Sequence, residues 1–374
     1  KKKKSGDFIM LTDEELESLY QKEFADCQSV LEVSDKLETI ESEYKDDLRG
    51  SLCNEILYMI SVGYTKYDRL NFEKSDLISL LCKNIQLISS GYTYMKAVNA
   101  FFKYDDKKCL MLLENWLEES YQKAKDTIKK PADFMDEYGF VDTCFEPFKE
   151  AFPGFWTSLG QILKKFPCQK GLPELCEVID LYYRCKTDEE TLDMLLDAMQ
   201  KYPDIILIKE LIAYTYYSMK MWNNAIAYLE LLEESSYFFR KYDVYFMFAW
   251  SYGKLKNRRL EEEYYRKSLE ENPYNIDTIN NLGFCLYTQK KFTEAKALFE
   301  KCLEIDQNYA YASNNYVRVL IALGRNKDAK AFVNLGKYKI SKEFRRRVEK
   351  LDNTNARIKK SVEKDVVVES TDDE

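Results

Sequence analysis

Residues 276–309 of this chain read IDTINNLGFCLYTQKKFTEAKALFEKCLEIDQNY. Apolar or small side chains occupy positions 7, 8, 11, 20, 24 and 27 of this 34-residue stretch, namely Leu282, Gly283, Leu286, Ala295, Phe299 and Cys302. Spacings of three and four residues place such side chains on one face of an α-helix. The stretch therefore predicts two amphipathic helices that pack against each other through these positions.

The same six positions recur along the chain at intervals of 34 or 36 residues. The predicted units are 172–205, 206–241, 242–275, 276–309 and 310–343. Small residues at positions 8 and 20, such as Ala213 and Ala225, let the two helices of a unit approach closely where they cross. One helical pair cannot bury its apolar face alone, so consecutive units are expected to stack. We therefore predict an all-α fold, an α-solenoid of helix-turn-helix repeats.

This pattern resembles the tetratricopeptide repeat, whose signature is Trp-x2-Leu-Gly-x2-Tyr, followed by Ala-x3-Phe and then Pro. The resemblance covers residues 172–343, with Pro203 and Pro273 at the position of the family's proline. Glu261 departs from the pattern, because it replaces the small residue at position 20. The resemblance implies a superhelix whose concave wall binds proteins or peptides. A generic helical bundle whose apolar spacing mimics a repeat is the alternative interpretation.

The segments on either side of the repeats are predicted from weaker patterns. Residues 1–171 show irregular apolar stripes and predict an irregular all-helical N-terminal domain, in which 90–123 fits a degenerate repeat. Residues 344–360 predict a capping helix with one apolar face, and the acidic tail 361–374 predicts disorder. The opening Lys1–Lys4 is interpreted as a fragment boundary, with a nuclear-targeting signal as the alternative.

Composition argues against catalysis and metal binding. The 374 residues contain no histidine, which excludes histidine nucleophile pairs, general bases and metal ligands. The ten cysteines form no Cys-x-x-Cys pair, and no glycine-rich phosphate loop is present. We predict a non-catalytic protein without metal or cofactor, although an enzyme that uses carboxylates or lysine within residues 1–171 stays open. No apolar run is long enough to cross a bilayer, and reduced thiols favour a cytoplasmic location, with a nuclear one as the alternative.

The resemblance also identifies candidate binding residues. In this repeat type, positions 2, 5, 9 and 12 of each first helix point into the concave groove, and position 6 lies at its edge. The candidates are Tyr214, Tyr217, Phe246, Trp250, Asn280, Asn281, Phe284, Tyr287, Tyr311, Asn314, Asn315 and Arg318. Aromatic rings are strong interface anchors, and asparagine amides can both donate to and accept from a peptide backbone. The alternative is that these rings pack against the N-terminal half or the capping helix.

These patterns favour an adaptor or regulatory subunit that holds a protein or peptide partner in a larger assembly. Asp243 and Asp277 occupy position 2, where the carboxylate clamp of chaperone co-factors has cations, so that role is disfavoured. A nucleic-acid-associated scaffold, for example in RNA processing, is the alternative function. The net charge of −8 and the pI near 5.2 oppose it. A sensor of peptide signals is a variant of the same hypothesis, and no membrane or small-molecule partner is predicted.

Overall fold

The computed structural model describes residues 13–27, 30–62, 74–87, 93–148, 151, 153–235 and 241–350. Within these ranges every regular element is a helix and no β-strand is present, which confirms the all-α class predicted from sequence. The chain divides into two compact units, Lys1–Ile208 (unit 1) and Lys209–Glu374 (unit 2). The Lys1–Lys4 start, the tail 361–374 and the last part of the predicted capping helix lie outside the described residues.

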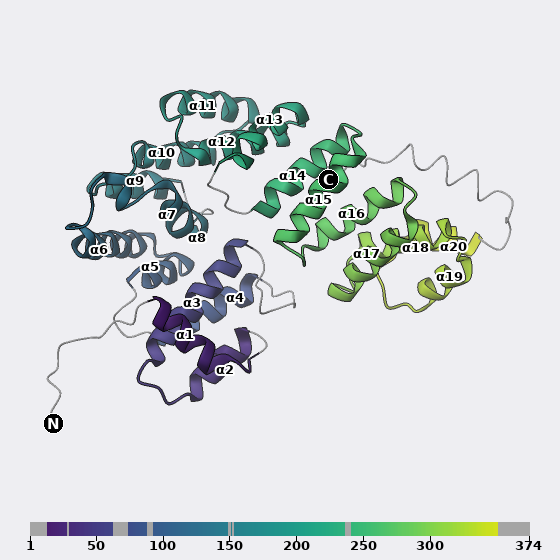
Figure 1. Cartoon of the computed structure of the whole chain (residues 1–374), viewed down its shortest axis with the longest axis horizontal. Helices are drawn as coiled ribbons and strands as arrows, with labels where there is room; N and C mark the ends of the chain where they lie inside the picture. The colour runs from purple at the N-terminus through teal and green to yellow at the C-terminus, as the bar shows by residue number, and fades with distance from the viewer. Residues whose placement is uncertain are drawn as a thin grey trace. The chain divides into compact units, whose positions relative to one another are not determined.

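Unit 1 contains long helices separated by a stretch of short helical turns (Figure 1). Its elements are α1 (Asp13–Phe24), α2 (Val30–Thr39), α3 (Lys45–Val62), α4 (Lys74–Leu87), α5 (Thr93–Phe102), α6 (Asp106–Ala124), a 3-10 turn (Pro131–Asp133), α7 (Glu137–Gly139), a π-helical turn (Phe140–Phe145), α8 (Glu146–Phe148), α9 (Phe155–Leu163), α10 (Leu172–Tyr182) and α11 (Asp188–Lys201). The next helix, α12 (Ile206–Ser218), contains the division between the two units.

Aromatic packing fills the middle of unit 1. The Trp156 side chain is fully buried, and its ring lies 5.5 Å from that of Phe145 and 6.1 Å from that of Phe140. Phe155 contacts the same indole at 5.7 Å. These rings come from α9 and from the short turns before it, so the irregular stretch is held in place by a packed core.

Two buried carboxylates in unit 1 bind the backbone at the beginning of a distant helix. Asp180 on α10 accepts hydrogen bonds from the N–H groups of Gly154 (3.1 Å) and Thr157 (3.0 Å), at the first turn of α9. Glu137 accepts from the N–H groups of Ile206 (2.8 Å) and Leu207, at the start of α12. The first N–H groups of a helix have no partner within it, and these carboxylates supply one from elsewhere in the chain.

After α12 come α13 (Trp222–Glu233), α14 (Lys241–Lys254), α15 (Arg258–Glu271), α16 (Ile276–Thr288), α17 (Phe292–Ile305), α18 (Ala310–Ala322), α19 (Asn326–Asn334) and α20 (Lys342–Glu349). From α13 to α20, each helix of unit 2 packs against the next (Figure 1). The pairs α14–α15 and α16–α17 correspond to the first and second helices of the predicted units 242–275 and 276–309.

The turns between the first and second helices share one geometry. Lys220, Lys256, Lys290 and Gly324 all have positive φ values, from 59° to 72°, and all stand at position 15 of their units. The following residue donates its N–H to the carbonyl five residues back, at 2.9 Å in every case, as Lys291 does to Leu286. This is the bond that closes an α-helix at a left-handed residue. The α5–α6 turn has the same geometry, with Tyr104 at a φ of 58°.

Helices α16 and α17 approach closely at Gly283, where position 8 faces position 24 (Phe299) rather than the predicted position 20. A Cβ added to Gly283 would lie 2.7 Å from the ring of Phe299, and Ala295 and Phe299 are fully buried. Leu282 and Leu286 belong to the same apolar cluster. Gly283 is therefore required because the Phe299 ring occupies the space that a side chain would need.

Glu261 is accommodated in unit 242–275 by a glycine on the facing helix. Its side chain is buried, and a Cβ on Gly253 would lie 2.7 Å from its Oε1 atom. Arg258 Nη1 lies 2.5 Å from Oε2 and compensates the charge. Burial raises the pKa of this carboxyl. Gly253 in α14 thus provides the room that a small residue at position 20 provides in the other units.

A second acidic residue, Glu262, links neighbouring repeats. Its carboxylate accepts from Lys291 Nζ (2.8 Å), Gln289 Nε2 (2.8 Å) and Arg266 Nη2 (2.9 Å). Partial burial acts to raise its pKa, but these three donors outweigh that effect and lower the pKa to about 2. The ionised form is therefore favoured by folding.

We expect the stabilisation from Glu262 to depend on pH. Its folded-state pKa lies below the ordinary 4.5, so its contribution is complete above about pH 4.5 and is lost as the pH falls toward 2. Glu262→Gln should cost about 1–3 kcal/mol of unfolding free energy at pH 7 and much less near pH 2.5. Urea denaturation of both proteins at the two pH values measures the difference. An equal cost at both values would contradict this ionic role.

Candidate functional site

All twelve candidate residues lie on the first helices of consecutive helical pairs in unit 2, namely α12, α14, α16 and α18. Most are half-buried, which is typical of side chains that form the wall of a surface row. Three differ: Tyr311 is 68% exposed, whereas Asn280 and Tyr287 are each only 6% exposed. We call the twelve candidates the inner row; its two buried members, Asn280 and Tyr287, support their neighbours in it.

Aromatic contacts form the first part of the inner row. The rings of Phe246 and Trp250 stack at 6.2 Å with an interplanar angle of 17°. Phe246 also contacts the ring of buried Tyr265 at 5.8 Å, and Lys254 Nζ lies 4.9 Å above the Trp250 ring. Tyr217 packs against Trp222 at 5.5 Å, and burial raises the pKa of its hydroxyl. These rings are preorganised by packing, so little side-chain entropy would be lost on binding.

Tyr265 supports this part of the row, although sequence reasoning did not single it out as a site residue. It stands at position 24 of its unit, where the pattern indicates a core residue, and it is 1% exposed. It is itself a core side chain, and its ring packs against that of Phe246. Only the pairing of rings across α14 and α15 reveals that role.

Asparagines connect two consecutive units in the middle of the inner row. Asn315 Nδ2 on α18 donates to Asn280 Oδ1 on α16 at 3.0 Å, and Asn280 Nδ2 donates to Asn281 Oδ1 at 3.4 Å. Buried Asn280 thus orients its two neighbours. Within the described part of the chain, Asn281 Nδ2 donates no hydrogen bond and Asn315 Oδ1 accepts none. One donor and one acceptor therefore remain available, as an extended peptide backbone requires.

The last part of the inner row is in contact with the cap helix α20. The guanidinium of Arg318 lies 5.5 Å from the ring of Phe284 and 5.4 Å from that of Phe344. Asn314 Oδ1 accepts from the N–H of Ser341 at 3.0 Å, just before α20. Asn314 therefore serves the attachment of α20. At this end of the row, two of the candidate side chains, Asn314 and Arg318, therefore contact α20 or the residue before it.

Two candidate tyrosines differ strongly in how exposed their side chains are. Tyr287 is buried between Phe284 (6.2 Å) and Phe292 (5.4 Å), so it supports the row from beneath. Tyr311 projects from the first turn of α18, beside the Tyr309 ring at 5.7 Å. The family resemblance placed both at groove-facing repeat positions, Tyr287 on α16 and Tyr311 on α18, but it could not distinguish a supporting ring from an exposed one.

The two buried cysteines of these helices are protonated near neutral pH. Burial raises the pKa values of the Cys285 and Cys302 thiols to about 12, so neither is a thiolate nucleophile near neutral pH. The described residues contain no group of three or more Cys, Asp or Glu side chains placed to hold a metal ion. Among the helices described, none is long and apolar enough to span a membrane.

Two segments of unit 2 match sequence models of one repeat family. Residues 242–275 and 286–342 match models described as tetratricopeptide repeat. These segments are tetratricopeptide repeats. The match confirms the predicted repeat family for these two segments of the predicted array. Tetratricopeptide repeats are stacking units that present an extended surface to other proteins, so this region is a protein-interaction scaffold.

No curated protein matches the chain in sequence. Among solved structures it is similar to YrrB, a tetratricopeptide repeat protein with an unusual peptide-binding site, at 16% identity and a TM-score of 0.35, over 50% of this chain and 87% of that one. It is also similar to a tetratricopeptide repeat protein from Parabacteroides merdae (14% identity, TM-score 0.33, 73% and 98% covered). The human IFIT1 dimer with m7Gppp-AAAA is a third (15%, 0.36, 87% and 73%). The assignment of residues 242–275 and 286–342 to the tetratricopeptide repeats rests on the matched sequence models.

Proposed function

We propose that this protein is a non-catalytic adaptor or regulatory subunit that holds an extended segment of a partner protein along the inner row. The observation that carries the proposal is the order of groups along the row. Stacked Phe246 and Trp250 offer apolar area, and the asparagines that follow offer one donor and one acceptor. Aromatic anchors beside backbone-binding amides suit an extended peptide, whose side chains and backbone both need partners.

The repeats proposed to build this row are 206–241, 242–275, 276–309 and 310–343. Their first helices contribute equivalent positions, because stacked repeats repeat the same surface. A row of this kind contacts several successive residues of a ligand. Its specificity comes from the side chains that differ between repeats. A peptide-signal sensor would use the same row, with a short free peptide in place of a protein segment.

Selection of a peptide library against the full chain provides the test. A peptide selected in this way should lose about 30-fold in affinity or more when Trp250→Ala removes the central ring, because hot-spot aromatics contribute about 2 kcal/mol or more. Asn281→Ala should weaken the same peptide by a smaller factor. Fluorescence anisotropy of the labelled peptide measures both.

The matched control is Leu231→Ala, which removes an exposed apolar side chain from α13, outside the inner row. It should leave the affinity of the selected peptide unchanged. Circular dichroism would establish that all three variants keep the helix content of the parent. Equal affinities for parent and folded Trp250→Ala, or a library that yields no binding peptide, would refute the proposed function.

A further inference from the structure

The last repeat and the cap helix carry a concentrated positive charge. Residues 310–350 contain eleven Lys and Arg against three Asp and Glu, a net charge of +8, while the whole chain carries −8. The remaining residues together therefore carry −16. A charge of this size within one short stretch produces a local field that attracts anionic groups.

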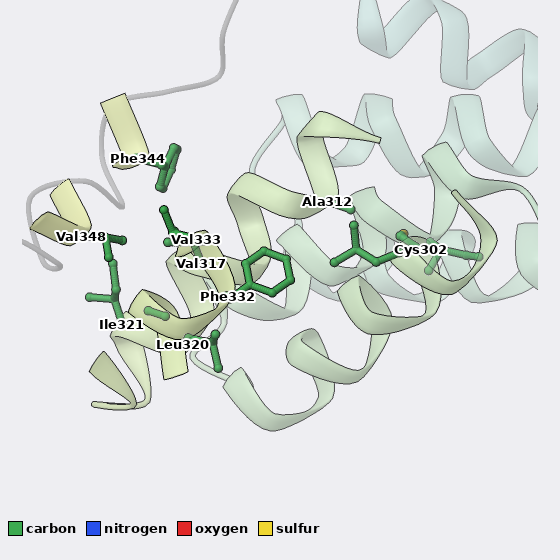
Figure 2. Close-up of a cluster of buried hydrophobic side chains, with 12 residues drawn as sticks. Cys302, Ala312, Val317, Leu320, Ile321, Phe332, Val333, Phe344 and Val348 are labelled. Atoms are coloured by element: carbon green, nitrogen blue, oxygen red, sulfur yellow. The ribbon is translucent and has the colours of Figure 1, made fainter. Parts of the chain in front are cut away.

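On α20, apolar side chains face the core and several basic side chains are exposed. Phe344 and Val348 point from α20 toward Val333 and Ile321 in a buried apolar cluster (Figure 2). Lys342, Arg346 and Lys350 recur every four residues, so they share one face of the helix, and all three are exposed. Lys337 and Lys339, in the connection from α19, are exposed as well.

Part of this charge has no acidic partner among the described residues. Within residues 310–350, all of which the structure describes, an ion pair joins Arg325 to Asp328 at 2.5 Å. Lys342, Arg346 and Lys350 form no ion pair with any described residue. Basic side chains that are not paired within the fold are available to an anionic partner.

Arg318 connects this charge to the inner row. Its guanidinium carbon lies 5.5 Å from the ring centre of Phe284 and 5.4 Å from that of Phe344, and among the described residues no carboxylate pairs with it. A guanidinium without a carboxylate partner keeps the N–H groups along its planar edge available. That edge is the one that binds a carboxylate in bidentate fashion.

We infer that the surface formed by Arg318, Lys337, Lys339, Lys342, Arg346 and Lys350, here named the basic cap, binds a run of Asp and Glu residues in the partner protein. The inference rests on the proposed function, which sets the direction in which the partner's segment runs along the inner row. The apolar part of the segment lies along the inner row, and its acidic part follows onto the basic cap. Helix α20 is about 12 Å long, which matches about four residues of extended peptide.

An acidic peptide fits this surface better than a nucleic acid does. Duplex DNA carries one charge per roughly 1.7 Å of its axis over its whole length, so it would extend from the basic cap onto the strongly acidic remainder of the chain. A short acidic segment places its charges only where the basic side chains lie. Charge complementarity over this limited area therefore selects the peptide.

Fluorescein-labelled octaglutamate is the probe for the test, and anisotropy with the full chain is the readout. The double change Lys342→Glu with Arg346→Glu should lower the affinity about tenfold or more, since two positive charges are replaced by two negative ones at the surface. The matched control, Lys256→Glu with Arg259→Glu, makes the same change of charge at exposed positions of α15 and the turn before it. It should alter the affinity by less than about twofold. Exposed substitutions of this kind leave the fold intact, and circular dichroism checks this.

Three results would overturn the inference. One is an equal loss of affinity in both double variants, which would show a response to total charge alone. Another is tighter binding of an eight-nucleotide RNA than of octaglutamate. A third is competition by a peptide of residues 361–374, together with tighter octaglutamate binding after removal of those residues, because the occupant would then be the chain's own acidic end. Octaglutamate binding that survives Trp250→Ala supports the basic cap even where the inner row fails its own test.

Discussion

Phe299→Ala should destabilise unit 2 by about 3–5 kcal/mol, the range found when a fully buried phenylalanine is truncated. The Phe299 ring is completely buried between α16 and α17 and lies directly over Gly283. Removing it leaves a cavity beside a residue without a side chain, so neither helix can fill the space without moving. Urea denaturation followed by circular dichroism measures the loss, and hydrogen exchange in α16 and α17 locates it.

A double-mutant cycle tests whether the close approach at Gly283 is the cause. Gly283→Ala should destabilise the parent, although alanine favours a helix by about 1 kcal/mol over glycine, because its Cβ would lie 2.7 Å from the Phe299 ring. In a Phe299→Leu background the same change should cost less or become stabilising. Identical effects of Gly283→Ala in the two backgrounds would show that helix crossing does not depend on this contact.

The repeat itself could be predicted from sequence because its determinants are local. Helical periodicity places Leu282, Leu286 and Phe299 in the core whatever the rest of the chain does, and they are buried. The need for a small residue at position 8 follows from the same geometry and is met by Gly283. Glu261 was an apparent violation. Its compensation by Gly253 depends on which residues face each other across two helices, and that is visible only in three dimensions.

The candidate site was predictable as a set of helix positions, but its internal contacts were not. A fixed helical period places Phe246 and Trp250 on one face, and their rings do stack. No periodicity could indicate that Asn314 would bind the backbone of Ser341, or that Arg318 would lie about 5.5 Å from rings on two different elements. These contacts depend on where α20 packs, and α20 lies beyond the repeating pattern.

Long-range capping in unit 1 is similarly invisible to sequence patterns. The first turn of α9 follows Gly154, which has a φ of 91° and offers no side chain to bind the free N–H groups. Asp180 supplies that function from 23 and 26 residues away. A local capping signal is therefore absent from the sequence at the start of α9, although the helix is well capped.

Asp180→Ala should accordingly destabilise unit 1 by about 3 kcal/mol, since several hydrogen bonds to a charged acceptor are lost together. The Asp180 side chain is buried, and the N–H groups of Gly154 and Thr157, the Thr157 hydroxyl and Arg184 all donate to it.

Asp197→Ala, which removes an exposed carboxylate paired with Lys201, is the control and should cost less than about 1 kcal/mol. Asp180→Asn keeps one acceptor oxygen in place and should fall between the two. Thermal unfolding monitored by circular dichroism ranks the three variants. A loss for Asp180→Ala no larger than that for Asp197→Ala would mean that solvent can replace the carboxylate at the start of α9.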